Sequence, residues 1–209
     1  MVFPSGSVTH LPPADLAAAG ELGVMARLEE AGVALGVVVL PSAIEDAFYR
    51  LNNLPPRLAR LYQGLDPRDP DEDIVEEAEQ AAVALLSGSY LLDDLIDAIY
   101  ASLAALPEVV EVRRPGARGS AVTGPRAALL AVKRIFTDDW TTEAVLSRLS
   151  VTGRLGIEAR PVIVHAAAPV AVAPTAVTSQ VHAVVGGDVR FAVDEVGRVI
   201  RVHGAGASS

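Results

Sequence analysis

Hydrophobic residues in the first two-thirds of the chain recur at the three- and four-residue spacing of a helix. The clearest case lies between residues 90 and 106, where one face would carry Leu92, Leu95, Ile99, Leu103 and Leu106. Similar patterns predict further helices over residues 14–31, 42–51, 57–63, 71–86, 125–136 and 142–150. Ser42 followed by Glu45 three positions later fits a capping box at the start of the second of these helices.

Valine-rich runs predict strands. The run over 33–40 is continuously apolar, which is typical of a buried strand, and a shorter strand is expected at 109–113 before a flexible stretch at 115–120. In the last fifty residues, strands are expected at 157–165, 177–185, 189–193 and 199–202. Glycine turns separate the last three of these strands, so the pattern indicates an antiparallel meander.

These elements predict an α+β fold, with a helical N-terminal two-thirds that contains a buried strand, followed by an antiparallel β meander. The expected regions are a helix–strand–helix unit (1–65), a mainly helical, charge-segregated region (66–156), an antiparallel β region (157–203) and a tail (204–209). With 209 residues, 51% of them apolar, the chain is long enough for one large domain or two small ones.

Charge is sorted into blocks along a chain of net charge -9. Between residues 66 and 97 there are eleven acidic side chains and one basic side chain, Arg68. Between residues 112 and 137 there are six basic side chains and no acidic one. Such blocks affect the choice of partners and assembly more than the fold.

Several classes of function find no support in the sequence. There is no cysteine, which excludes disulfides, thiolate metal sites and a cysteine nucleophile. Neither a phosphate-binding glycine loop nor a nucleophile elbow around Ser42 is present. The N-terminus lacks the features of a signal peptide, so a cytoplasmic protein or a component of a soluble particle is expected. The uncharged segment 161–187 is long enough to cross a bilayer, but its three prolines argue against a spanning helix.

The acidic block allows two interpretations. Glu72-Asp73-x-x-Glu76 followed by Asp94-x-x-Asp97 resembles the paired acidic motifs of MazG-like nucleotide pyrophosphohydrolases, over residues 71–106. The resemblance implies an all-α, Mg²⁺-dependent enzyme that cleaves nucleoside triphosphates, with Glu72, Glu76, Asp94 and Asp97 as metal ligands. The other interpretation is a solvated helix face, because Asp93, Asp94 and Asp97 lie opposite the apolar stripe.

The basic block and the histidines suggest two further sites. Arg113, Arg114 and Arg118 flank a glycine–proline turn and could contact phosphates, as in a binding module for nucleic acid or another polyanion. His165, His182 and His203 lie on predicted strands and could share a zinc ion, although histidines on such strands are more often found at the edge of the core. Trp140 is expected to pack at the edge of the core or to anchor an interface.

The leading hypothesis is a non-enzymatic structural or assembly protein that needs no cofactor and forms a homo-oligomer or docks onto a larger complex. The charge blocks favour it, since they could pair within one chain or between copies. The proline-broken segment 161–187 is expected to be extended and to pack on a neighbouring chain through Pro169, Val170, Val172 and Pro174. The alternatives are the Mg²⁺-dependent pyrophosphohydrolase and the polyanion-binding module.

Overall fold

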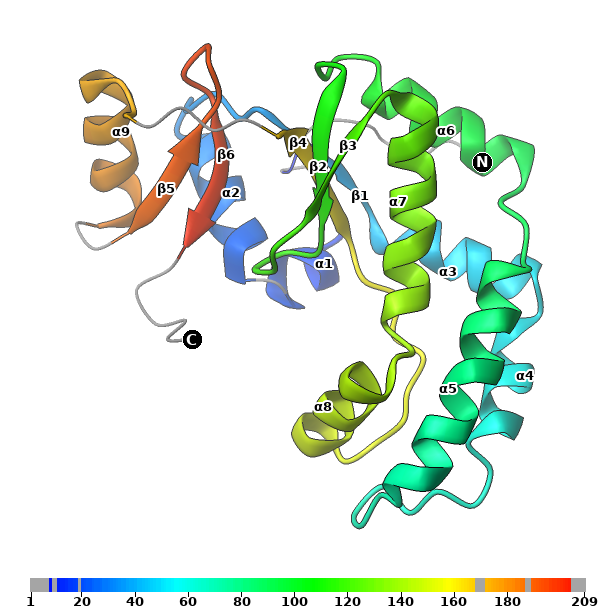
Figure 1. Ribbon diagram of the computed structural model, residues 1–209. Coiled ribbons are helices and arrows are strands. Elements are labelled where there is room, and N and C mark those ends of the chain that lie inside the picture. The colour runs from blue at the N-terminus through cyan, green and yellow to red at the C-terminus, as the bar shows by residue number, and fades with distance from the viewer. Residues whose placement is uncertain (1–7, 9–10, 19, 168–171, 187–188, 204–209) are drawn as a thin grey trace.

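A four-stranded antiparallel sheet lies at the centre of the protein (Figure 1). The computed structural model describes residues 8, 11–18, 20–167, 172–186 and 189–203. The strands of this sheet are β1 (Val37–Leu40), β2 (Val109–Arg113), β3 (Ser120–Thr123) and β4 (Val162–Ala166), in the spatial order β1-β4-β2-β3. Helices and a separate two-stranded hairpin complete the described chain, which confirms the α+β prediction.

β4 joins the parts of the chain that the sequence suggested were separate. On one side, Val164 lies opposite Val38 of β1, and on the other side it lies opposite Val112 of β2. All three predicted regions therefore contribute to the same sheet, the middle region with two strands and each of the others with one. The predicted C-terminal meander is confirmed for its last two strands, at 189–193 and 199–202, which pair antiparallel, but it is wrong for β4, which pairs with distant strands rather than with those that follow it.

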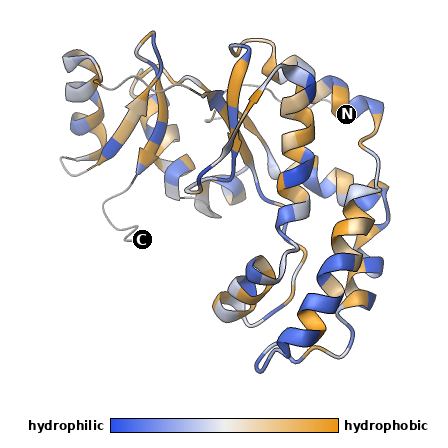
Figure 2. Cartoon of the chain, in the orientation of Figure 1, coloured by the Kyte–Doolittle hydropathy of each residue, from blue (hydrophilic) through white to orange (hydrophobic). Residues whose placement is uncertain are grey.

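The alternating side chains of the sheet face two different cores, as the two-residue period of a strand requires. Val38, Val112 and Val164 belong to the larger core, whereas Val39 and Ile163 belong to the smaller one. In Figure 2 the central strands are mostly hydrophobic, in keeping with a sheet that is covered on both faces.

Six helices form the layer that encloses the larger core. They are α3 (Ser42–Leu51), α4 (Leu54–Leu61), α5 (Glu72–Ser87), α6 (Asp93–Leu103), α7 (Pro125–Asp138) and α8 (Thr142–Thr152). Phe48 and Phe136 meet inside this core with ring centroids 5.5 Å apart. Trp140 is buried as well, which confirms the prediction that it packs in the core and not the alternative that it anchors an exposed interface.

The second layer contains α1 (Pro13–Ala18), α2 (Gly20–Glu30), α9 (Thr175–Val185) and the hairpin of β5 (Arg190–Val193) and β6 (Val199–His203). The hairpin contacts the segment just before β1, where the N–H of Gly36 donates to the carbonyl oxygen of Val199 at 2.9 Å. Leu22, Met25 and Val181 are buried in the smaller core of this layer.

The largest local error of the sequence-based prediction is at α9, which was expected to be a strand and part of an extended segment. β-branched residues favour strands, but this preference is weak compared with tertiary packing. Val177, Val181 and Val184 are spaced as on one helix face, and all three contact the smaller core. Burial of that face accounts for the helix.

Smaller differences occur at element ends. The helix predicted over 14–31 is two helices, and the one predicted over 57–63 begins at Leu54. β3 was not predicted, and it begins at Ser120, the last residue of the stretch expected to be flexible. The predicted capping box is wrong. Pro41 is the N-cap residue, and the N–H of Ser42 donates to Asp15 at 3.1 Å, while Glu45 is buried in an ion cluster.

Candidate functional site

The first notable site is a buried ion pair between the sheet and the second layer. Arg113, the last residue of β2, is 1% exposed and donates two hydrogen bonds to Glu21 of α2, at 2.6 and 2.7 Å. Glu21 also accepts the N–H groups of Gly116 at 2.7 Å and Val202 at 3.1 Å. Burial alone would raise the pKa of Glu21, but Arg113 and the two N–H groups outweigh it and hold this pKa below its ordinary value.

His165 completes this first cluster. Its Nε2 accepts a hydrogen bond from Nε of Arg113 at 3.0 Å, so its proton is on Nδ1, which donates to the carbonyl oxygen of Ala166 at 2.8 Å. Burial lowers the pKa of His165, and the positive charge of Arg113 acts in the same direction. The imidazole is therefore a neutral hydrogen-bond acceptor for the arginine.

A second cluster surrounds the next residue, Arg114. Its Nη2 lies 2.8 Å from Oε1 of Glu45 and 2.6 Å from Oδ2 of Asp139. Asp139 also pairs with Arg160, whose backbone N–H donates to Glu45 at 2.7 Å. These contacts join α3 and the turn after α7 to the segment before β4, so the cluster holds together elements that lie far apart in the sequence.

Two aromatic residues extend the second cluster into the larger core. The Tyr49 hydroxyl donates to Glu45 at 3.1 Å and accepts the indole N–H of Trp140 at 3.0 Å. Burial raises the pKa of Glu45, and Arg114 offsets this rise only in part. Burial also raises the pKa of Tyr49, and the neighbouring Glu45 adds to the increase.

The predicted anion-contact residues are divided by these clusters. Arg113 and Arg114 are buried and already paired with carboxylates, whereas Arg118 is exposed. The expectation that Arg113 and Arg114 form an exposed phosphate-binding patch is therefore wrong. The sequence could not reveal their partners, because Glu21 and Glu45 lie 92 and 69 positions away.

A small cleft separates the two clusters. It has a volume of about 220 Å³ and is lined by Gly20, Glu21, Arg114, Pro115, Gly116, Arg160 and Pro161. Glu21, Arg114 and Arg160 are each engaged in ion pairs with other protein groups. A group that enters the cleft would thus meet charges that are already compensated.

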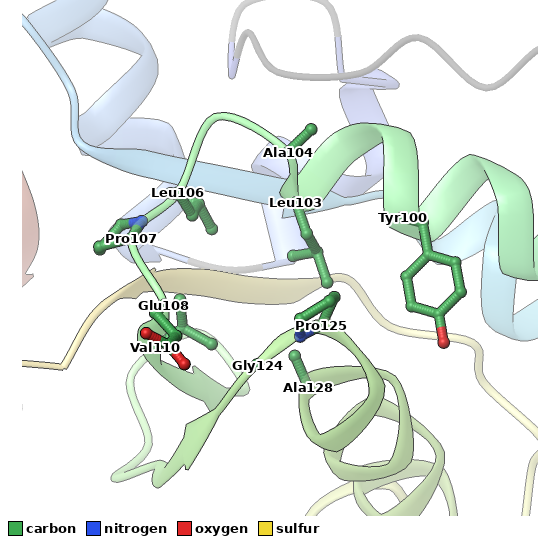
Figure 3. Close-up of a pocket in the computed structure, with 10 residues that line it drawn as sticks. All are labelled: Tyr100, Leu103, Ala104, Leu106, Pro107, Glu108, Val110, Gly124, Pro125 and Ala128. Atoms are coloured by element: carbon green, nitrogen blue, oxygen red, sulfur yellow. The ribbon is translucent and has the colours of Figure 1, made fainter.

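An apolar pocket of about 370 Å³ lies where α6 ends and α7 begins (Figure 3). Leu103, Leu106, Val110, Pro125 and Ala128 form much of its wall. Tyr100 and Glu108 are the only lining residues with polar side chains. A pocket of this volume can hold a small ligand, but among the described residues no hydrogen bond joins the Tyr100 phenol to the Glu108 carboxylate, so the two are not arranged as a nucleophile and its base.

The proposed magnesium ligands do not converge. Glu72 and Glu76 on α5 and Asp94 and Asp97 on α6 are all exposed. In the part of the chain that the structure describes, no three histidine, cysteine or acidic side chains gather as a metal site would require. The magnesium-site prediction is therefore wrong at these positions, and the sheet contradicts the all-α fold that the MazG-like resemblance implied.

The geometry of α5 and α6 explains why these carboxylates remain apart. Val75 and Ala82 on α5 and Leu95 and Ile99 on α6 are buried in the larger core, so each helix turns its acidic side outward. The interpretation as a solvated face is confirmed. The three histidines are also scattered: His165 is buried, and His182 and His203 are exposed.

Two of the four predicted interface residues, Val172 and Pro174, lie in the described part of the chain. Val172 is 82% exposed, and Pro174 is exposed at the N-cap of α9. Pro169 and Val170 lie outside the described residues. Because α9 is helical, the expectation that the whole of 161–187 is extended is wrong.

The acidic helix α5 and the basic helix α7 pack against each other in the folded chain. Among the described residues, the basic block forms ion pairs with Glu21, Glu45, Asp138 and Asp139. It forms none with the acidic residues of 66–97. Pairing of the two blocks within one chain, one of the sequence-based alternatives, is thus absent from this part of the molecule. α5 and α7 carry distinct hydrophilic and hydrophobic bands in Figure 2.

Within the described chain, no helix has the length and apolar character that crossing a membrane would require. Comparison with protein families and with curated proteins gives no match for this chain.

Proposed function

We propose that the protein is a non-enzymatic assembly protein that binds copies of itself through oppositely charged surfaces. The observation that carries this proposal is the absence of ion pairs between the acidic and basic blocks among the described residues. Charged surfaces that are not compensated within a chain are available to complementary surfaces on another chain.

Exposed apolar side chains next to these charges support the same proposal. Tyr90 is 78% exposed and precedes the acidic start of α6, and Leu130 is 57% exposed among the basic residues of α7. Protein interfaces commonly combine a few apolar or aromatic anchors with a polar rim. Each of the two surfaces has this composition.

The buried chemistry favours a structural role over an enzymatic one. Arg113, Arg114 and their carboxylate partners bind one another and connect separate elements. Among the described residues that line the apolar pocket, only Glu108 and Tyr100 have polar side chains, and no hydrogen bond joins them. A polyanion-binding function would depend on the exposed basic residues that remain, such as Arg118 and Arg126.

Light scattering coupled to size-exclusion chromatography tests this function. The full chain should form species larger than the 21.7 kDa monomer at micromolar concentrations and about 0.15 M salt. Association should weaken near 1 M salt, where the screening length falls to about 3 Å. A monomer at every concentration and ionic strength would contradict the proposal, and binding of DNA or RNA at low salt would favour the polyanion alternative.

A further inference from the structure

One of the two surfaces is the basic groove, which we define by Arg126, Leu130, Lys133 and Arg134 of α7 together with Val83 of α5. The four α7 residues follow the spacing i, i+4, i+7 and i+8, which places them along one helix face. A hollow of about 430 Å³ runs between this face and α5, and its lining includes Val83, Leu130, Lys133 and Arg134. Ser87, Thr137 and Asp138 complete the lining, so the hollow combines two apolar side chains, two basic side chains and Asp138, the ion-pair partner of Arg134.

The contacts of the basic groove leave much of its charge exposed. Nζ of Lys133 donates to the carbonyl oxygen of Ser87 at 2.7 Å, which keeps it beside α5. Arg134 lies 3.7 Å from Asp138 in a pair whose side chains are 77% and 57% exposed. Such an exposed pair contributes little, so Arg134 can exchange it for another carboxylate at small cost. Arg126 is exposed and has no ion pair within the described chain.

The other surface is the acidic edge, which we define by Tyr90, Leu92, Asp93, Asp94 and Asp97. All five are exposed. The three aspartates have no ion pair with any described residue, because the described arginines that form ion pairs do so with other carboxylates. The edge therefore has an apolar part beside an acidic part.

Asn52 holds the apolar part of the acidic edge in place. Its side-chain amide donates to the carbonyl oxygen of Tyr90 at 2.9 Å and accepts the Tyr90 N–H at 3.0 Å. The backbone of Tyr90 is therefore ordered although its side chain is exposed. An aromatic residue whose backbone is already fixed loses less conformational entropy on binding than one on a free loop.

We infer that the acidic edge of one copy docks into the basic groove of a second copy of this chain. Tyr90 and Leu92 would cover Leu130 and Val83, while the three aspartates would meet Arg126, Lys133 and Arg134. The two surfaces are opposite in charge, with three basic side chains against three aspartates, and each has an apolar part. This inference rests on the assembly function proposed above and assigns its contact residues.

The net charge of -9 opposes contact between two copies, but the repulsion between two charges depends on the distance between them. At physiological ionic strength the screening length is about 8 Å, so charges elsewhere on the surface are largely screened while groups in direct contact are not. Local attraction between the edge and the groove then outweighs the repulsion of the remaining charges. Two copies related by a two-fold axis would make both contacts at once, whereas a head-to-tail array would make one per junction.

Charge reversal on each surface separately, followed by mixing, tests the inference. The groove variant is Arg126→Glu with Arg134→Glu, and the edge variant is Asp94→Lys with Asp97→Lys. Each alone should raise the concentration needed for association by about tenfold or more, since two attractive contacts become repulsive. An equimolar mixture should restore association as a species containing both variants, because the groove of one variant and the edge of the other become complementary.

Matched controls reverse equal charge at other exposed sites. These are Arg57→Glu with Arg60→Glu on α4, and Glu76→Lys with Glu77→Lys on α5. Both should associate as the unmodified chain does, and circular dichroism should confirm that every variant is folded. If the unmodified chain associates but the groove and edge variants associate equally well, or if their mixture stays monomeric, the docking inference is wrong while the assembly function stands. A monomeric unmodified chain would overturn both.

Discussion

Arg113 and Glu21 form a buried ion pair through two hydrogen bonds, with Nη1–Oε2 and Nη2–Oε1 distances of 2.6 and 2.7 Å, across 92 positions of sequence. The pair joins the end of β2 to α2, and Glu21 also binds N–H groups of the following loop and of β6. It is thus a connection between the central sheet and the second layer.

Replacement of Glu21 with glutamine should destabilise the protein strongly. The substitution leaves the Arg113 charge buried without its counter-ion, a change that typically costs about 3–5 kcal/mol in the free energy of unfolding. Urea unfolding can be followed by fluorescence of Trp140, which is the single tryptophan and is 1% exposed.

The control for this substitution is Asp46→Asn, which removes the exposed Arg50–Asp46 pair and should cost about 0–1 kcal/mol. The double variant Glu21→Gln with Arg113→Met should recover stability relative to Glu21→Gln alone, because no uncompensated charge remains. Equal effects of Glu21→Gln and Asp46→Asn would show that the buried pair has no special importance.

His165 should make stability depend on pH. Its pKa in the folded protein lies below the ordinary value of 6.5, so the unfolded chain takes up a proton at a higher pH than the folded chain does. The stabilising contribution is therefore complete above pH 6.5 and decreases as pH falls through 6.5 toward the pKa of the folded state.

Thermal unfolding between pH 8 and pH 5.5 tests this dependence. His165→Gln retains an acceptor for Arg113 but cannot titrate, so its midpoint temperature should change less over this range. The slope for the unmodified chain cannot exceed about 1.4 kcal/mol per pH unit from one group. Identical pH profiles for the two proteins would contradict this role of His165, and His203→Gln at an exposed position is the matched control.

Gly36 should resist any side chain, because the hairpin approaches it closely. A Cβ atom built there would lie 2.7 Å from Oδ2 of Asp194 and 2.9 Å from Cγ2 of Ile200. Gly36→Ala should therefore destabilise the fold by about 1–3 kcal/mol, as overpacking does. Gly156→Ala meets only Glu158 at 3.9 Å and should be nearly neutral in the same unfolding measurement.

Trp140→Phe should have a moderate effect. It preserves an aromatic ring against Tyr62 but removes the indole N–H that donates to Tyr49 at 3.0 Å. Loss of one buried hydrogen bond typically costs about 0.5–1.5 kcal/mol. Circular dichroism during urea unfolding measures this loss, and Tyr49→Phe should abolish most of the further effect of Trp140→Phe if the hydrogen bond is the cause.

Local sequence patterns were sufficient to predict the helices, strands and exposed faces that depend on the spacing of neighbouring residues. The helical spacing over 71–86, 125–136 and 142–150 predicted α5, α7 and α8 to within about two residues at each end. The valine-rich segment at 109–113 predicted β2 with its observed bounds. The outward position of the acidic side chains on α6 followed from the apolar stripe on its other side.

The tertiary structure alone decided which distant elements meet. In sequence Arg113 and Arg114 are part of a basic block, but Glu21 and Glu45 neutralise them because the fold brings α2 and α3 to the end of β2. The valines of α9 suit a strand or a helix, and contact with the smaller core selects the helix. Charge and periodicity along a chain record local preference, whereas long-range pairing depends on the path of the whole backbone.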